Sequence, residues 1–271
     1  MLHILYYRTL KLHEKKPWVT FVHGAGGSSA IWYKQIREFK KHYNILLIDL
    51  RGHGRSAKGL WKDGDDFSEI AEEVIHVHDR LKISSSHFVG ISLGTIVIQT
   101  IAKIRPGLLS SMVLGGAITK LNVFTRMLLV VGNLGKRILP YMWLYSLFAW
   151  IIMPYATHKE SRTMFISQAK KMCQKEFIQW FSLTRFVNPY LIELQKDFYK
   201  IPVLFLMGEQ DHLFLKPVKE IAAENKDVQA MYIADSGHVC NIDQPDRFNH
   251  LAVSFIKKIE ADRFSVRIKN A

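Results

Sequence analysis

Short apolar runs alternate with amphipathic stretches through the first half of the chain. The runs at 18–22 (WVTFV), 45–48 (ILLI) and 87–89 are rich in β-branched or aromatic residues and end at glycine or turn residues, as buried parallel strands do. Between them, residues 31–42 and 67–81 carry apolar residues at three- and four-residue spacing, which is typical of helices packed on a sheet. The alternation predicts an α/β fold with a mainly parallel sheet flanked by helices.

The same pattern continues beyond residue 90. A mostly apolar helix is predicted over 95–104 and ends before Pro106. Residues 111–115, 203–207 and 231–233 supply further strands. Only one strand fits ahead of Trp18, so the sheet is expected to begin with fewer strands than usual.

The alternation stops between residues 119 and 200, where the composition is helical and no strand is indicated. We therefore predict a core formed by 1–118 and 201–271 and a helical cap, or lid, formed by 119–200. The apolar run from Tyr141 to Met153 is shorter than the ~20 residues that span a bilayer, and Pro140 and Pro154 bracket it. A cap is favoured over a membrane-interacting segment. A helical hairpin that serves as a cap and also contacts a membrane is kept as a third alternative.

Composition narrows the class of protein. The chain has 271 residues, 48% of them hydrophobic, which predicts a globular protein and excludes disorder, and Lys and Arg exceed Asp and Glu by 37 to 24. The basic residues lie in short runs without a nucleic-acid-binding motif, so no nucleic-acid partner is expected. Peripheral contact with an anionic membrane stays a hypothesis, and the oligomeric state is not predicted. Two cysteines and the lack of a signal-like beginning indicate a cytoplasmic protein, with contact at the inner membrane surface left open.

Gly90 to Gly94 (GISLG) match the G-x-S-x-G pattern between a predicted strand and a predicted helix. A tight turn there would expose the Ser92 hydroxyl, and the two glycines would allow close approach of neighbouring backbone. The following helix would direct its N-terminal amides at developing negative charge. Ser92 is therefore the candidate nucleophile.

A serine nucleophile needs a base, and the chain has 12 histidines. Those in polar or terminal segments are expected to be solvated: His3, His13, His42 and His158. His76 and His78 lie two residues apart on one helix, which does not place them on one metal-binding face, and no metal site or cofactor motif is predicted. His238 follows Gly237 in a loop after the last predicted strand and is the candidate base.

The carboxylate that orients the base is expected just past a strand. Asp211 lies in the turn after the buried run 203–207, where open α/β sheets assemble their sites. Glu209 is expected to point outward from the same turn. Asp235 is only three residues from His238, too close in one tight loop to reach the far side of the ring. Asp211 is therefore preferred.

An oxyanion hole completes the set. The glycine-rich loop His23–Ser28 (HGAGGS) permits backbone conformations that direct amides at a ligand, and it lacks the spacing of a nucleotide-binding fingerprint. We assign the backbone N–H groups of Ala25 and Leu93 to this role.

Five segments in this order and spacing resemble the α/β-hydrolase superfamily with an inserted cap, similar to carboxylesterases and monoacylglycerol lipases: HGAGGSSAIW (23–32), DLRGHGRS (49–56), GISLGT (90–95), GEQDHLF (208–214) and SGHVCNIDQPDRF (236–248). The resemblance covers 18–117 and 202–255. It implies the fold, a Ser92–His238–Asp211 catalytic triad and bracing roles for His23 and for the turn from Asp49 to Gly54. The resemblance does not extend to the cap.

The resemblance implies a serine esterase for small-molecule esters. A serine at the elbow disfavours dehalogenases and epoxide hydrolases, which carry aspartate there. Residues 128–131 and 142–153 are expected to line an apolar acyl pocket, which favours short- to medium-chain acyl groups, or to form only the cap's own core. Thioesterase, lactonase, amidase and C–C bond hydrolase activities stay open, as does a ligand-binding receptor with little turnover.

Overall fold

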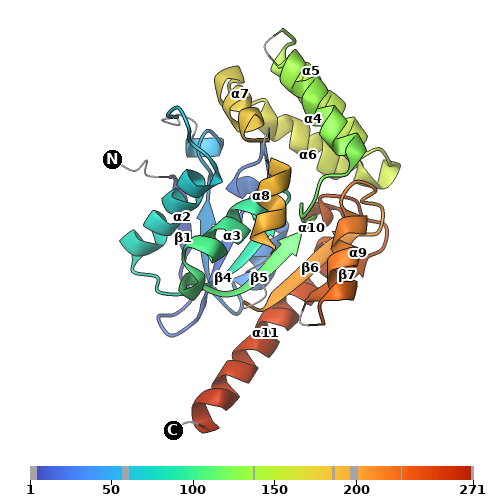
Figure 1. Cartoon of the computed structure of the whole chain (residues 1–271). Coiled ribbons are helices and arrows are strands. Elements are labelled where there is room, and N and C mark those ends of the chain that lie inside the picture. Colours follow the sequence, from blue (N-terminus) through green and yellow to red (C-terminus); the bar gives the residue numbers. More distant parts are fainter. Residues whose placement is uncertain are drawn as a thin grey trace.

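A seven-stranded sheet organises the chain. The computed structural model describes residues 5–56, 61–136, 138–184, 187–195, 201–226 and 228–269, the last without side chains beyond 265. The strands lie in the order β1-β3-β2-β4-β5-β6-β7 (Figure 1). Their bounds are Tyr7–Leu10 (β1), Trp18–Val22 (β2), Asn44–Ile48 (β3), Ser86–Ile91 (β4), Leu109–Gly115 (β5), Val203–Gly208 (β6) and Gln229–Ile233 (β7).

All the strands except β1 run parallel, and β1 pairs antiparallel with β3 along one edge. The mainly parallel sheet predicted from the sequence is confirmed, and β1 is the one strand that the described residues place ahead of Trp18. Helices separate successive parallel strands because a parallel connection must cross back over the sheet.

Helices cover both faces of the sheet, and alternate strand residues enter two separate cores. In β3, Leu46 packs into one core, whereas Ile45 and Leu47 pack into the other. The first core includes α2 (Phe67–Leu81), α3 (Leu93–Ile104), α8 (Val187–Leu194) and α9 (Leu215–Glu224). The second includes α1 (Tyr33–Phe39), α10 (Cys240–Asp243) and α11 (Pro245–Lys269). Alternation with a period of two is what lets one strand serve both faces.

Local sequence sets the helix ends. Helix α2 begins at a capping box, in which the Asp66 side chain accepts a hydrogen bond from Ser68 N and the Glu69 side chain accepts one from Asp66 N. The helix ends at Lys82, which adopts the left-handed conformation. The helix predicted over 31–42 is shorter, since Ser29–Trp32 forms a 3-10 turn ahead of α1. Further 3-10 turns span Gly54–Ser56, Pro106–Leu108 and Ala156–His158.

The segment between β5 and β6 is helical. Besides α8 it contains α4 (Val123–Gly135), α5 (Tyr141–Ile152), α6 (Lys159–Ala169) and α7 (Gln174–Leu183). Helices α4 to α7 gather beyond one end of the sheet, at the top of the view in Figure 1. No helix in the described ranges is long and apolar enough to cross a membrane. The boundaries of a separate cap subdomain at 119 and 200 stay a prediction.

Candidate active site

Ser92 lies on a sharp turn between β4 and α3. Its backbone angles are φ 54° and ψ −123°, a region that non-glycine residues rarely adopt. A Cβ atom at Gly94 would lie 2.2 Å from the Val22 carbonyl oxygen, and one at Gly90 would lie 2.5 Å from Ile98 Cδ1. Backbone atoms therefore leave no room for a side chain at Gly94, whereas at Gly90 the end of the Ile98 side chain would have to move and the backbone of Gly94 would lie 3.1 Å away.

The structure brings Ser92, His238 and Asp211 together although they lie far apart in the sequence. His238 Nε2 is 2.8 Å from Ser92 Oγ, and His238 Nδ1 is 2.8 Å from Asp211 Oδ2. Both His238 and Asp211 are buried. A carboxylate at Nδ1 keeps the proton on that nitrogen, which leaves Nε2 free to accept the serine proton.

Asp211 is held by the turn that follows β6. Its Oδ1 accepts hydrogen bonds from the backbone N–H groups of Leu213, at 3.3 Å, and Phe214, at 3.1 Å. These bonds leave Oδ2 directed at His238. Both rival carboxylates, Glu209 and Asp235, are exposed, so the preference for Asp211 agrees with the geometry.

The glycine-rich loop passes directly beside Ser92. A Cβ atom at Gly24 would lie 3.1 Å from Ser92 Cβ, and Ala25 follows it in the chain. Within the described part of the chain, the backbone N–H groups of Ala25 and Leu93 donate no hydrogen bond. Two unpartnered donors next to the serine are the arrangement that an oxyanion hole needs.

Hydrogen bonds from two directions hold the peptide between Ala25 and Gly26. The Tyr145 hydroxyl on α5 donates to the Ala25 carbonyl oxygen at 2.6 Å, and the Gly26 N–H donates to His53 Nε2 at 2.8 Å. Burial raises the pKa of Tyr145 well above its usual range, and burial keeps the pKa of His53 well below its own, so both groups stay neutral. Tyr145 falls within the stretch 142–153 that was expected to line the pocket, but its hydrogen bond to the glycine-rich loop was not predicted because no motif marks it.

The turn after β3 braces the same loop, in agreement with the resemblance. Asp49 accepts from Ser29 N at 2.7 Å and from Arg55 N at 2.9 Å. His23 Nε2 accepts from Leu50 N at 2.9 Å, and burial lowers the pKa of His23. These bonds tie the glycine-rich loop to a neighbouring strand end.

His158 contradicts the expectation that it is solvated. It is fully buried, its Nε2 is 2.9 Å from Gln210 Oε1, and its ring lies against Gly237, next to the candidate base. It is buried because the helical segment folds over the sheet and meets the His238 loop, which a local sequence window does not reveal. His13 is exposed and His42 is partly exposed, whereas His3 lies outside the described residues.

Two further groups near the base were not anticipated as parts of the site. Asp243 accepts from Gly237 N at 2.9 Å, and burial raises the pKa of its carboxyl group. Cys240 is fully buried, and burial raises the pKa of its thiol, so it is a packed residue of the His238 loop. No group of three or more His, Cys, Asp or Glu side chains in the described ranges could hold a metal ion.

A cavity of about 200 Å³ opens beside Ser92 and His238. None of its described lining residues is charged, and most are apolar. The helical segment supplies the greater part of its described wall: Leu121, Thr125, Leu128, Leu129, Tyr145, Phe148, Ile152, Phe165, Met172, Phe177, Trp180, Phe181, Thr184 and Val187. A second cavity of about 30 Å³ also borders Ser92, and Phe165 lines both cavities.

The predicted pocket-lining stretches prove to be divided. Tyr145, Phe148 and Ile152 of α5 face the cavity, whereas Trp143 and Trp150 of the same helix are exposed. On α4, Leu128 and Leu129 line the cavity and Val130 and Val131 face solvent. Each of these helices therefore has one apolar side that faces the cavity and another that faces solvent, and composition alone could not tell which residues belong to which side.

Comparison with known protein families gives a match over most of the chain. A family model described as the alpha/beta hydrolase family matches residues 21–251. Over 101 residues the chain is 35% identical to an (E)-2-((N-methylformamido)methylene)succinate hydrolase of Acinetobacter baylyi. That match covers 36% of this chain and only 36% of the length of that relative.

Longer matches are more distant. The chain is 21% identical over 243 residues to 3-oxoadipate enol-lactonase 2 of Acinetobacter baylyi, which covers 90% of both proteins. Among solved structures, the enol-lactonase from Burkholderia xenovorans LB400 superimposes with a TM-score of 0.79 at 20% identity, over 93% of this chain and 96% of that one. The structural match concerns the fold.

Proposed function

Because this chain belongs to the alpha/beta hydrolase family, as its motifs predict, and is a hydrolase, we propose that it is a serine esterase. It would cleave carboxylic esters with an apolar short- to medium-chain acyl group. The observation that carries the proposal is the continuous set of hydrogen bonds from Ser92 Oγ through His238 to Asp211.

The proposed reaction has two steps. Ser92 Oγ attacks the ester carbonyl while His238 Nε2 takes its proton, and the oxyanion of the tetrahedral intermediate binds the N–H groups of Ala25 and Leu93. His238 then gives the proton to the leaving alcohol, and the acyl group stays on Ser92. Water, deprotonated by His238, attacks the acyl-enzyme and releases the acid. Asp211 keeps His238 in the required tautomer throughout.

The size and lining of the cavity support the proposal of an apolar acyl group. Its volume of about 200 Å³ lies below the ~300–1,000 Å³ of typical small-molecule sites, which suits one chain of modest length. A charged group would lose its hydration there without gaining a partner among the described lining residues. The smaller cavity, which borders Ser92 and is also lined by Val239 and Ile242, would accept a small alcohol portion.

A lactone hydrolase is the second candidate, favoured by the named enol-lactonase relative that aligns over 90% of its length. The same triad would open a cyclic ester, with the released alcohol staying joined to the acyl group. The uncharged cavity favours a lactone without a carboxylate.

The test combines a nucleophile variant with a substrate series. p-Nitrophenyl esters from acetate to laurate are expected to give a maximum at an intermediate chain length, because a longer apolar chain fills the cavity until it no longer fits. Ser92→Ala is expected to lower kcat by about 10⁴ or more, and Ser254→Ala, an exposed serine on α11, should leave it unchanged.

Three results would contradict the proposal. Retained turnover in Ser92→Ala would contradict the assignment of Ser92 as nucleophile. A maximum at acetate, with no longer ester accepted, would contradict the proposed apolar acyl group. A wild-type protein that neither hydrolyses esters nor reacts with a fluorophosphonate probe would instead be a binding protein. Lactones tested beside the esters separate the two candidate substrates.

A further inference from the structure

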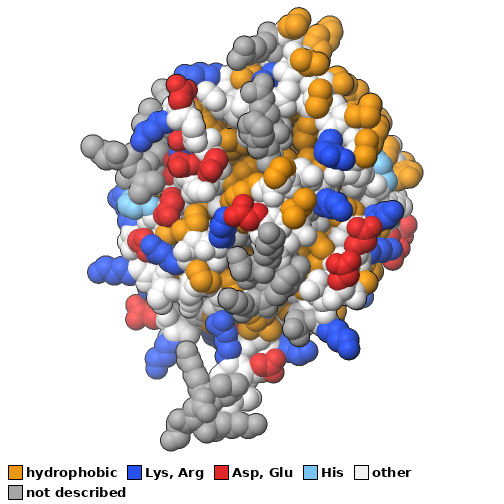
Figure 2. Space-filling view, in the orientation of Figure 1, with side chains coloured by type: hydrophobic (Ala, Val, Ile, Leu, Met, Phe, Trp, Pro, Cys, Tyr) orange, Lys and Arg blue, Asp and Glu red, His pale blue; other side chains and the backbone are white. Residues whose placement is uncertain are grey.

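Helices α4 and α5 leave a large apolar surface uncovered, which we call the α4–α5 face. Its members are exposed hydrophobic residues that recur at helical spacing along both helices. Those on α5 are Trp143, Leu147 and Trp150. The remaining exposed members are Val123, Phe124, Met127, Val130, Val131, Leu134, Ile138, Leu139 and Tyr155. Figure 2 shows hydrophobic side chains gathered over these helices at the upper margin of the molecule.

The residues of the α4–α5 face are exposed although both helices pack well against the rest of the protein. Leu134 and Trp143 have exposed fractions of 72% and 70%, while the opposite sides of both helices are packed. A Cβ atom at Gly132 of α4 would lie 2.9 Å from Phe148 of α5 and 2.4 Å from Phe181 of α7. The hairpin therefore rests firmly on the protein, and an apolar patch of this extent marks an interaction surface.

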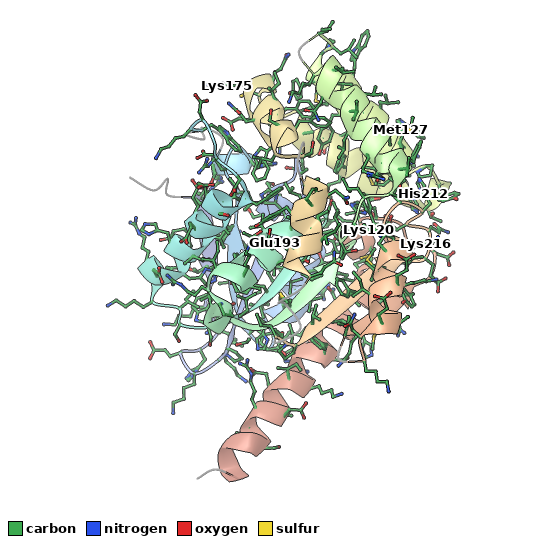
Figure 3. All side chains as sticks on the ribbon, viewed as in Figure 1. Lys120, Met127, Lys175, Glu193, His212 and Lys216 are labelled. Atoms are coloured by element: carbon green, nitrogen blue, oxygen red, sulfur yellow. The ribbon has the colours of Figure 1, made fainter. Side chains whose placement is uncertain are left out.

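The segment that carries the α4–α5 face has charge of one sign. Residues 117–158 contain no Asp or Glu, and their charged residues are all Lys or Arg. Arg126 is exposed on α4, Lys120 is exposed just before it, and Lys216 is exposed on α9. Figure 3 shows Lys120 and Lys216 below α4 in the view and Met127 on α4 itself. The formal net charge of the whole chain is +13.

From these observations we propose that the α4–α5 face docks on the surface of an anionic lipid bilayer. The apolar side chains enter the boundary between headgroups and acyl chains, where exposed tryptophans are favoured, and Lys120, Arg126 and Lys216 face the anionic headgroups. A second copy of the chain fits this surface less well. Two such faces would bring basic residues together, with no acid in 117–158 to neutralise them.

Docking in this way would place the membrane one helix layer from the cavity. Leu128 and Leu129 of α4 and Phe148 of α5 line the cavity, on the opposite sides of the helices that carry the α4–α5 face. An apolar ester dissolved in the bilayer would then reach the site without crossing water. Membrane docking itself does not depend on the esterase activity and can be measured without it.

Vesicle flotation with the Ser92→Ala protein tests the proposal. Binding is expected to equimolar phosphatidylcholine and phosphatidylglycerol vesicles at low salt, with weaker binding to pure phosphatidylcholine and at high salt. The double variant Leu134→Gln/Trp143→Gln is expected to bind at least about tenfold more weakly, because two inserted apolar side chains are lost. Phe264→Gln, on α11 and 67% exposed, is the control that should bind normally.

Charge is tested separately. Arg126→Gln is expected to weaken binding to the anionic vesicles about fivefold, while Lys258→Gln, at an exposed residue of α11, should not. Absence of binding to anionic vesicles at low salt would overturn the proposal, as would equal binding by the double variant. A concentration-dependent dimer in sedimentation, abolished by the double variant, would assign the surface to a second copy instead.

Discussion

Around Ser92, single hydrogen bonds determine where the backbone N–H donors of the proposed oxyanion hole lie. The Ala25 N–H belongs to a loop whose next peptide is held by Tyr145 from the helical segment and by His53 from the turn after β3. An oxyanion donor is effective only when it is held in place before the reaction begins. The proposed oxyanion hole therefore depends on a residue of α5 that touches no reacting atom.

Removing the Tyr145 hydroxyl should test this positioning role. Tyr145→Phe is expected to lower kcat about tenfold with little change in KM, since full loss of an oxyanion donor costs 10²–10³ and a misplaced one costs less. Tyr141→Phe is the matched control, because its hydroxyl also donates to a carbonyl oxygen, that of Met172, but away from the loop. Equal losses of kcat in the two variants would show a merely structural role.

The carboxylate behind His238 gives a second prediction at this scale. Asp211→Asn is expected to lower kcat by about 10⁴ at neutral pH, because an amide N–H would favour the wrong tautomer of His238. The exposed carboxyls Glu209 and Asp235 are the controls, and Glu209→Gln and Asp235→Asn should retain full activity. Steady-state kinetics with the best ester of the series measures all three. Unchanged activity in Asp211→Asn would assign the acid elsewhere.

At the scale of elements, helix α2 docks on the sheet through a buried histidine. His78 Nδ1 donates to Val74 O, and Nε2 accepts from the Thr20 hydroxyl on β2 at 2.9 Å. Burial lowers the pKa of His78 from its ordinary 6.5 to about 4. The helix therefore fits the sheet only while this imidazole is neutral.

This contact predicts how stability depends on pH. The folded-state pKa of His78 lies below its unfolded value, so its contribution is complete above pH 6.5 and is lost as the pH falls towards 4. The loss amounts to about 3 kcal/mol in the free energy of unfolding, from the difference between the two pKa values. Urea unfolding between pH 7 and pH 4 measures it.

His78→Gln provides the comparison, because it keeps a polar side chain without a proton to gain. The variant is expected to lose less stability than the wild type over the same pH range, although it starts from a lower value. A parallel decline in both proteins would place the effect in other groups. His23 and His53, whose pKa values are also lowered by burial, are the first alternatives.

At the scale of the whole molecule, the helices that enclose the cavity also form the α4–α5 face. One side of α5 closes the site and the other side faces outward, so access to the cavity and contact with a surface belong to the same hairpin. The position of this hairpin relative to the sheet is what joins Tyr145 and His158 to the loops around Ser92.

The sequence by itself determined the sheet and the positions of the three central residues. Buried strands read as apolar runs, and the turns that carry Ser92, Asp211 and His238 follow such runs because parallel sheets place their sites at strand ends. The glycines at 90 and 94 were recognisable from the motif, and at Gly94 neighbouring backbone leaves no room for a side chain. Each of these signals is local in the chain.

Only the tertiary structure decided which face of each apolar helix is covered. Residues 123–152 are apolar on several sides, so periodicity could not tell the cavity side of α5 from its exposed side. The burial of His158 and the contact of Tyr145 with Ala25 likewise join residues that are far apart in the chain. Such contacts depend on how elements pack, and local patterns of hydrophobicity carry no record of that packing.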